Sequence, residues 1–114
     1  MDDEEFSARV FNASRPLEKI KLAVQEDRFT VLVRNDKPNL PDEFMQAVPS
    51  LPDNFRVETE KLKYPDPRAL KQSYELKKVP YGEMGAEFRL YIKGYFRKDG
   101  NRIVEFFVVS LRRE

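Results

Sequence analysis

Cations and tyrosines alternate along one stretch near the end of the chain. In an extended chain, residues two apart share one face of a strand, so this spacing brings the side chains into a single row. Such a row could stack nucleobases and neutralise phosphates. We favour a simpler interpretation, in which the row covers the outer face of a strand, since long amphipathic side chains lie on apolar surface with their charges in water. The residues are Arg89, Tyr91, Lys93, Tyr95 and Arg97.

Apolar residues beside this row suggest a third interpretation, a docking surface for another protein. We expect Val104, Phe106 and Val108 to lie on the same side of the sheet as the row. Exposed apolar area with a charged rim often marks a protein interface, and Tyr and Arg supply much of the binding energy there. We therefore favour a protein partner over RNA, and the predicted partner-binding residues are Arg89, Tyr91, Lys93, Tyr95 and Phe106.

A long β-hairpin over residues 86–113 is the element that must align these side chains. Its first arm alternates strictly, as a half-buried strand requires. The return arm is apolar on both faces, which is typical of a strand covered on both sides. The predicted faces are Phe88, Leu90, Ile92 and Phe96 on the first arm, with Ile103, Phe107, Val109 and Leu111 opposed to Val104, Phe106 and Val108 on the second.

An Asp-Gly pair at the tip is a strong hairpin signal. We favour a two-residue turn at Asp99-Gly100, which places Ile92 opposite Phe107. A three-residue turn with Gly100 in a bulge stays open, and it places Lys93 opposite Glu105. Pairs of opposite charge contribute only about 0.2–1 kcal/mol each, so they do not decide the register.

The first part of the chain is predicted to be less regular. Residues 1–5 are acidic and expected to be a frayed, disordered end, and residues 6–11 could form a short strand. We favour a helix over residues 16–26, with Ser14 as N-cap and Pro16 in the first turn. The same letters also alternate, so a strand over residues 19–24 that pairs with the next strand stays open.

Further elements complete an α+β fold in a single domain of residues 1–114. The predicted sheet has about five antiparallel strands, with the long C-terminal hairpin at its centre and one or two short helices. Prolines limit the segment around residues 42–48 to a short helix. The other expected elements are strands over residues 29–34, 55–62 and 74–79, a helical turn over 68–72 and a loop over 80–85.

Composition narrows the chemistry that the chain could perform. It contains no cysteine and no histidine, so we expect no metal site, no thiol chemistry and no cofactor. A charged fraction of 36% and an acidic start predict a protein without a membrane span or signal peptide, and we expect it in the cytoplasm. The net charge of +1 is too small to indicate a nucleic-acid binder. Nothing in the sequence bears on the oligomeric state.

A partial resemblance to a known family supports an alternative. Residues 74–77 (Tyr-Glu-Leu-Lys), 87–91, 99–104 and 110–113 resemble the C-terminal sheet of the RelE/ParE/HigB toxin ribonucleases. The resemblance implies cleavage of ribosome-bound mRNA without histidine, and hence RNA or the ribosome as the partner. Two long helices open that family, whereas prolines and predicted strands occupy residues 29–67 here. The catalytic residues that the resemblance implies are Lys77, Arg89, Arg112 and Arg113.

Overall fold

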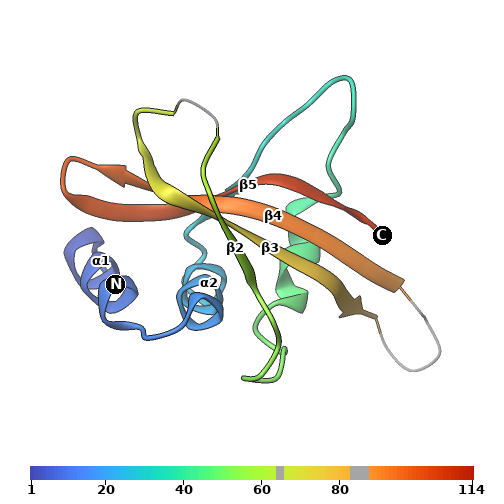
Figure 1. Ribbon diagram of the computed structural model, residues 1–114, viewed down its shortest axis with the longest axis horizontal. Coiled ribbons are helices and arrows are strands. Elements are labelled where there is room, and N and C mark those ends of the chain that lie inside the picture. The colour runs from blue at the N-terminus through green and yellow to red at the C-terminus, as the bar shows by residue number, and fades with distance from the viewer. Residues whose placement is uncertain (64–65, 83–87) are drawn as a thin grey trace.

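The computed structural model describes residues 1–63, 66–82 and 88–114 (Figure 1). The helices come first and the long strands last, which confirms the α+β class with five strands. The predicted start of the hairpin at Ala86 and part of the expected loop, residues 83–85, lie outside the described residues. In chain order the elements are α1 (Asp3–Asn12), α2 (Pro16–Gln25), β1 (Phe29–Val31), the 3₁₀ helix η1 (Asp42–Ala47), β2 (Glu58–Lys61), β3 (Ala69–Tyr81), β4 (Phe88–Asp99) and β5 (Arg102–Arg113).

The five strands form one mixed sheet in the order β1-β5-β4-β3-β2. Strands β2 to β5 pair antiparallel, but β1 pairs with β5 in parallel. The expectation of a wholly antiparallel sheet is therefore wrong at this edge. Parallel neighbours need a long connection between them. Here the chain leaves β1, passes through η1 to β2 on the opposite edge, and returns strand by strand to β5.

β4 and β5 form the predicted hairpin at the centre of the sheet. Its loop is two residues long, as predicted, but the loop residues are Gly100 and Asn101, because Asp99 still belongs to β4. Gly100 has a φ of +62°, which glycine adopts without steric cost. Both registers derived from the sequence are consequently wrong, and Ile92 lies opposite Leu111.

Two β-bulges in the hairpin decide which side chains of β5 face the core. The register shifts at Gly94 and again at Lys98, which leaves Val109 and Val104 as extra residues on β5. An extra residue reverses the alternation of the strand beyond it, so the predicted faces of β5 are right for Ile103 and Leu111 and wrong between the two bulges. The buried residues of β5, each at most 2% exposed, are Ile103, Phe106, Val108 and Leu111.

The acidic N-terminus forms helix α1, where we expected residues 1–5 to be frayed and residues 6–11 to be extended. The carboxylate of Asp2, the N-cap, accepts a hydrogen bond of 2.8 Å from an N–H of the first turn. Acidic residues in this turn also interact favourably with the helix dipole. Phe6 and Val10 lie four residues apart and are both buried. A helix buries this pair on one face, and the packing against β5 stabilises it.

Helix α2 confirms the structure that we favoured for residues 16–26 and excludes the strand over residues 19–24. Pro16 stands in the first turn, as predicted, but Arg15 rather than Ser14 is the N-cap, and it makes no side-chain capping bond. Burial of the apolar side of α2 therefore carries more of its stability than capping does.

The other predicted strands and the short helix are right in position and wrong at their ends, whereas the helical turn is wrong and the loop expected from Pro80 begins only after Tyr81. η1 confirms the short helix of residues 42–48. β3 begins at Ala69, so the helical turn expected over residues 68–72 is wrong. β1 and β2 are shorter than predicted and β3 is longer, relative to the expected strands 29–34, 55–62 and 74–79.

The helices cover one face of the sheet and leave the other face open (Figure 1). α1, α2 and η1 lie together on the covered face, whereas the segment between β1 and η1 rises on the opposite side. We call the uncovered side the open face. The side chains that fill the space under the helices include Phe6, Ile20, Val24, Met45 and Val48 from the helical layer and Leu76, Leu90, Ile92, Phe96 and Phe106 from the sheet.

Candidate functional site

The open face carries the row of cations and tyrosines predicted for β4. Lys93 lies opposite Glu75 on β3 and opposite Ser110 on β5, and Tyr91 lies opposite Arg112. Partners across neighbouring strands share one face. Leu90, Ile92 and Phe96 are buried on the other face of β4, and within the row Tyr95 is only 5% exposed. The row therefore lies on one side of the sheet, as predicted, and the N-terminal helices lie on the other side, a point that the sequence left open.

A hollow of about 560 Å³ lies in the middle of the open face. Three cations line it, and among the described residues that form its wall there is no carboxylate. Aromatic and apolar side chains supply most of the remaining surface. The lining residues are Leu32, Arg34, Tyr91, Lys93, Tyr95, Phe107, Val109, Ser110 and Arg112.

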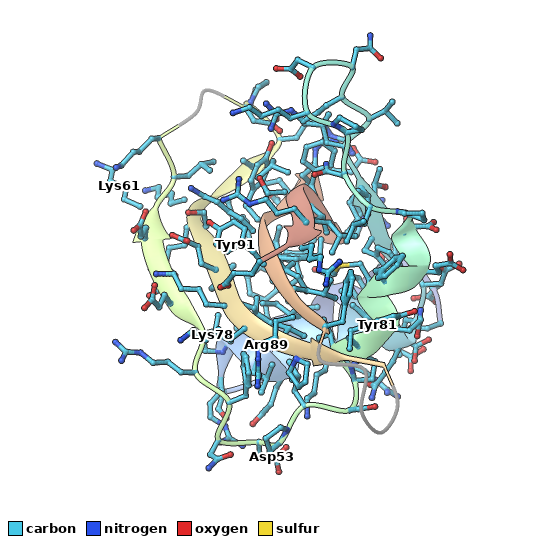
Figure 2. All side chains as sticks on the ribbon, turned by 90° about the vertical axis from the view of Figure 1, so that its right-hand side faces the viewer. Asp53, Lys61, Lys78, Tyr81, Arg89 and Tyr91 are labelled. Carbon is cyan, nitrogen blue, oxygen red and sulfur yellow. The ribbon has the colours of Figure 1, made fainter. Side chains whose placement is uncertain are left out.

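Tyr91 is fixed as one wall of the hollow. Its hydroxyl donates a hydrogen bond of 2.5 Å to the carboxylate of Glu75, and the guanidinium of Arg112 stacks over its ring at 4.6 Å. Burial raises the pKa of the Tyr91 hydroxyl, and the carboxylate of Glu75 adds to this effect. The ring is therefore neutral and one of its faces is occupied. Figure 2 shows Tyr91 between β3 and β4, away from Tyr81, which lies beside η1.

Tyr95 forms the other aromatic wall. Its hydroxyl donates a hydrogen bond of 2.6 Å to Asp66, and its ring packs against that of Phe107 at 5.5 Å. Burial, with a contribution from Asp66, raises the pKa of Tyr95 to about 12. The same hydrogen bond lowers the pKa of Asp66. This pair ties β4 to the segment that leads into β3 and holds the ring in place.

The cations of the row differ in what binds them. Arg97 stacks over the ring of Phe107 at 4.4 Å and forms ion pairs with Asp66 at 3.5 Å and Glu105 at 3.9 Å. Within the described part of the chain, Lys93 and Arg112 form no ion pair. Arg34, the third cation of the hollow, forms an ion pair with Asp36 at 3.6 Å. Arg97 and Arg34 are thus engaged in the structure, whereas the charges of Lys93 and Arg112 are available to a ligand.

The segment after β1 completes the hollow with Leu32 and Arg34. The side-chain amide of Asn39 holds this segment on β5, where it replaces the hydrogen bonds of a neighbouring strand. Its nitrogen donates to the carbonyls of Leu32 (2.8 Å) and Val109 (3.2 Å), and its oxygen accepts from the N–H of Leu111 (2.9 Å). Sequence analysis missed these residues, because nothing in the sequence indicates that β1 pairs with β5.

Phe106 cannot be a partner-binding residue, because its exposed fraction is 0%. Its ring packs in the core against Phe96, with ring centres 5.0 Å apart. The bulge at Val104 turns it away from the open face and puts Phe107 there instead. Of the other predicted partner-binding residues, Tyr91, Lys93 and Tyr95 line the hollow, whereas the exposed Arg89 stands nearer the end of the sheet, opposite Pro80.

Three of the four residues implied by the ribonuclease resemblance share the open face. Arg89 and Arg112 reach it by the alternation of β4 and β5. Lys77 reaches it on β3 and forms an ion pair of 3.1 Å with Glu58, which raises the pKa of Lys77. Arg113 lies on the other side of the sheet, where it stacks over the ring of Phe88 at 4.5 Å. Figure 2 shows Arg89 at the end of the sheet near Lys78.

Neither the carboxylates of the described residues nor the comparisons with known proteins add chemistry to this site. In residues 1–63, 66–82 and 88–114, no three carboxylates converge in a way that could hold a metal ion. No helix of the described chain is long and apolar enough to cross a membrane. No family model, no curated protein and no solved structure matches this chain.

Proposed function

We propose that this chain is an interaction module that binds a protein partner through the open face of its sheet. The observation that carries the proposal is the hollow, which combines three cations with aromatic and apolar walls and has no carboxylate among its described lining residues. A surface of this composition fits a segment with acidic side chains around an apolar group. Interfaces gain specificity from such complementary charges and much of their energy from Tyr and Arg anchors.

The arrangement of the rings favours a protein over a single-stranded nucleic acid. Nucleobases bind such surfaces by stacking on free aromatic faces. Here Arg112 lies over the ring of Tyr91, and the ring of Phe107 contacts both Tyr95 and Arg97. A base would have to displace these contacts. An acidic side chain could pair with Arg112 or Lys93 while the rings stay in place.

RNA is the second candidate, and one observation favours it. Lys77, Arg89 and Arg112 stand on three adjacent strands and share the open face, as a phosphate-binding set would. Under this alternative the protein would bind RNA or a ribosome and cleave mRNA, and Arg89→Ala would abolish cleavage. Binding would also weaken steeply with salt, because contacts to phosphates release counterions.

The deciding experiment places a photo-crosslinking amino acid at Ser110, on the wall of the hollow, in the full chain expressed in cells. We expect a crosslink to a protein that is lost with Lys93→Glu or Arg112→Glu. The matched control is Lys61→Glu, which makes the same charge change on β2 at the edge of the sheet and should leave the crosslink intact. Circular dichroism verifies that each variant is folded.

Two results would overturn the proposal. The first is a crosslink that survives both reversals at the hollow. The second comes from incubating the purified protein with single-stranded RNA at about 50 mM salt, alone and with ribosomes. RNA cleavage that disappears with Arg89→Ala would establish the second candidate in place of the first.

A further inference from the structure

The hollow on the open face has a cationic end and an apolar end. Lys93 lies directly opposite Ser110, and Tyr95 lies opposite Phe107, nearer the hairpin turn. The N–H of Leu32 donates to the carbonyl of Val108, so Leu32 lies beside the same part of β5 as Val109. We call Lys93, Ser110 and Arg112 the cationic end, and Leu32, Tyr95, Phe107 and Val109 the apolar end.

Three hydrogen-bond donors lie close together at the cationic end. Lys93 and Ser110 are directly opposite one another, a relation that places Cβ atoms about 4.5–5.5 Å apart. Ser110 and Arg112 are two residues apart on β5, a spacing of about 7 Å. An ammonium, a hydroxyl and a guanidinium all donate hydrogen bonds. They are therefore near enough to bind the oxygens of one small anion.

Two of these donors carry positive charges that have no ion-pair partner in the described part of the chain. Neither Lys93 nor Arg112 lies within ion-pair distance of a described carboxylate. Lys93 is also half-buried. A charge that is partly removed from water interacts more strongly with an opposite charge, so a bound anion is favourable at this end.

The carboxylates near the hollow have other partners. Glu75, opposite Lys93 on β3, accepts the hydrogen bond of the Tyr91 hydroxyl. It lies on the β3 side of Lys93, whereas the other two donors lie on the β5 side. Asp36 pairs with Arg34 at 3.6 Å, so Arg34 is not counted among the charges offered to a ligand. Neither carboxylate lines the hollow.

A phosphate monoester matches the cationic end better than a carboxylate does. At neutral pH it carries about 1.5–2 negative charges and three acceptor oxygens. It can therefore pair with Lys93 and Arg112 together and still accept a hydrogen bond from Ser110. A carboxylate carries one charge and leaves one of the two cations without a partner. The phosphodiester of a nucleic-acid backbone also carries only one charge per phosphate.

The apolar end indicates what kind of group bears the phosphate. The hollow of about 560 Å³ has the size of a small-molecule site, so a phosphate fills only part of it. Leu32 and Val109 are half-buried and give aliphatic surface next to the cationic end. An aromatic ring can pack on this surface without displacing the contacts of Tyr91 and Phe107. A phosphoserine has no apolar group that would reach it.

We propose that the hollow binds a phosphotyrosine side chain of the partner protein, with its phosphate on Lys93, Ser110 and Arg112 and its ring on Leu32 and Val109. This inference rests on the proposed function, because it names the group that the open face recognises in its protein partner. Clustered cations bind phosphorylated segments in other recognition domains. Phosphorylation of the partner would then control whether the complex forms.

Three small probes separate charge from shape in an NMR titration of the purified full chain. Phenyl phosphate carries both the charge and the ring, phenyl sulfate has the same shape with a single charge, and inorganic phosphate has the charge without the ring. We expect phenyl phosphate to bind at least about tenfold more tightly than phenyl sulfate, since it gains one more charge-assisted contact. It should also bind more tightly than inorganic phosphate and shift the resonances of Ser110 and Arg112.

Substitutions at the cationic end test which side chains hold the phosphate. Lys93→Gln and Arg112→Gln should each weaken phenyl phosphate at least about tenfold and remove its preference over phenyl sulfate. Ser110→Ala should weaken it about threefold. The matched control is Lys61→Gln, which removes the same charge from β2, at the edge of the sheet (Figure 2), and should leave binding unchanged. Circular dichroism verifies that each variant is folded.

Peptides test the source of the phosphate. A short alanine peptide that contains one phosphotyrosine should bind at least about tenfold more tightly than the same peptide with phosphoserine or with glutamate. The dinucleotide uridylyl-uridine tests the nucleic-acid alternative, because its single phosphate is a diester. It should bind no better than phenyl sulfate.

Four results would overturn this inference. They are equal binding of phenyl phosphate and phenyl sulfate, equal binding of the phosphotyrosine and phosphoserine peptides, dinucleotide binding as tight as that of phenyl phosphate, and no shift with the phosphotyrosine peptide up to about 1 mM. A Ser110 crosslink that joins two copies of the chain would also do so, since a second copy would then occupy the hollow.

The proposed function can survive the failure of this inference. A crosslink from Ser110 to another protein that is lost with Lys93→Glu, together with equal binding of phenyl phosphate and phenyl sulfate, would retain the protein partner and exclude the phosphotyrosine. A crosslink that survives both charge reversals would instead refute the proposed function itself.

Discussion

Gly94→Ala is the substitution for which the structure predicts the clearest effect. Gly94 lies at a bulge of the central hairpin, opposite Val108. A Cβ built at this position would lie 2.5 Å from the carbonyl oxygen of Phe107 and 2.8 Å from Cζ of Phe106. Both distances are too short for a carbon atom, so β4, β5 or the Phe106 ring would have to move.

The magnitude follows from what surrounds the new methyl group. The carbonyl of Phe107 belongs to the backbone of a central strand, so moving it strains the pairing of β4 with β5. The Phe106 ring is fully buried between Phe96 and Tyr74. Adding a methylene to a packed core costs about 1–3 kcal/mol, and losing one strand hydrogen bond costs about 1 kcal/mol. We therefore expect a loss of about 2–4 kcal/mol in the free energy of unfolding.

Urea denaturation followed by circular dichroism measures this loss as a lower midpoint at an unchanged slope. The matched control is Gly100→Ala, because a Cβ there meets no atom within 4 Å and only the positive φ of +62° opposes it. That control should cost about 1 kcal/mol. If Gly94→Ala proves as stable as Gly100→Ala, the close packing of β4 on Phe106 is wrong.

Three further predictions concern the same sheet. Phe106→Ala should cost about 3–5 kcal/mol by leaving a cavity in the core. Phe107→Ala should cost only about 1–2 kcal/mol, because its ring is half-buried on the open face. Equal losses of unfolding free energy in urea denaturation would contradict the assigned faces. Lys78 has a φ of +55°, so Lys78→Gly should be neutral or stabilise the protein by up to about 1 kcal/mol. Lys77→Gly should instead destabilise it by about 0.5–1 kcal/mol. The reverse order of thermal midpoints would show that β3 has no bulge at Lys78. Burial and Asp66 raise the pKa of Tyr95 from 10.0 to about 12. The unfolded chain therefore loses this proton first, and the free energy of unfolding should fall as the pH rises from 10.0 toward 12. If the Tyr95→Phe variant loses as much stability as the native chain over that pH range, Tyr95 does not contribute.

Local patterns in the sequence were sufficient to predict the α+β class, the helix over residues 16–26 and the C-terminal hairpin. Each depends on residues close together in the chain, such as the strict alternation from Phe88 to Phe96 or the glycine at the hairpin tip. They were also sufficient to place Tyr91, Lys93 and Tyr95 together on one side of β4. The period of a strand is a local property, so no knowledge of distant contacts was needed.

The faces of β5 depended on tertiary structure. An alternating pattern assigns Phe107 to the core and Phe106 to the surface. The bulges at Val104 and Val109 reverse this assignment. A strand that is apolar on both faces contains no local signal for such a bulge, because its odd-numbered and its even-numbered residues are equally suited to face the core. Packing of Phe106 against Phe96 and Gly94 decides between them.

The hollow depended on tertiary structure still more strongly. It is formed where β1 and the segment held by Asn39 meet β5, about seventy residues later in the chain. Sequence alone could indicate a strand at Phe29 but could not show which strand it pairs with or in which direction. Pairing of distant strands is a property of the whole sheet, because the burial of every other strand determines which edge is left for β1. The cations of the row were therefore predictable from the sequence, whereas the site that they form with Arg34 was decided by the fold.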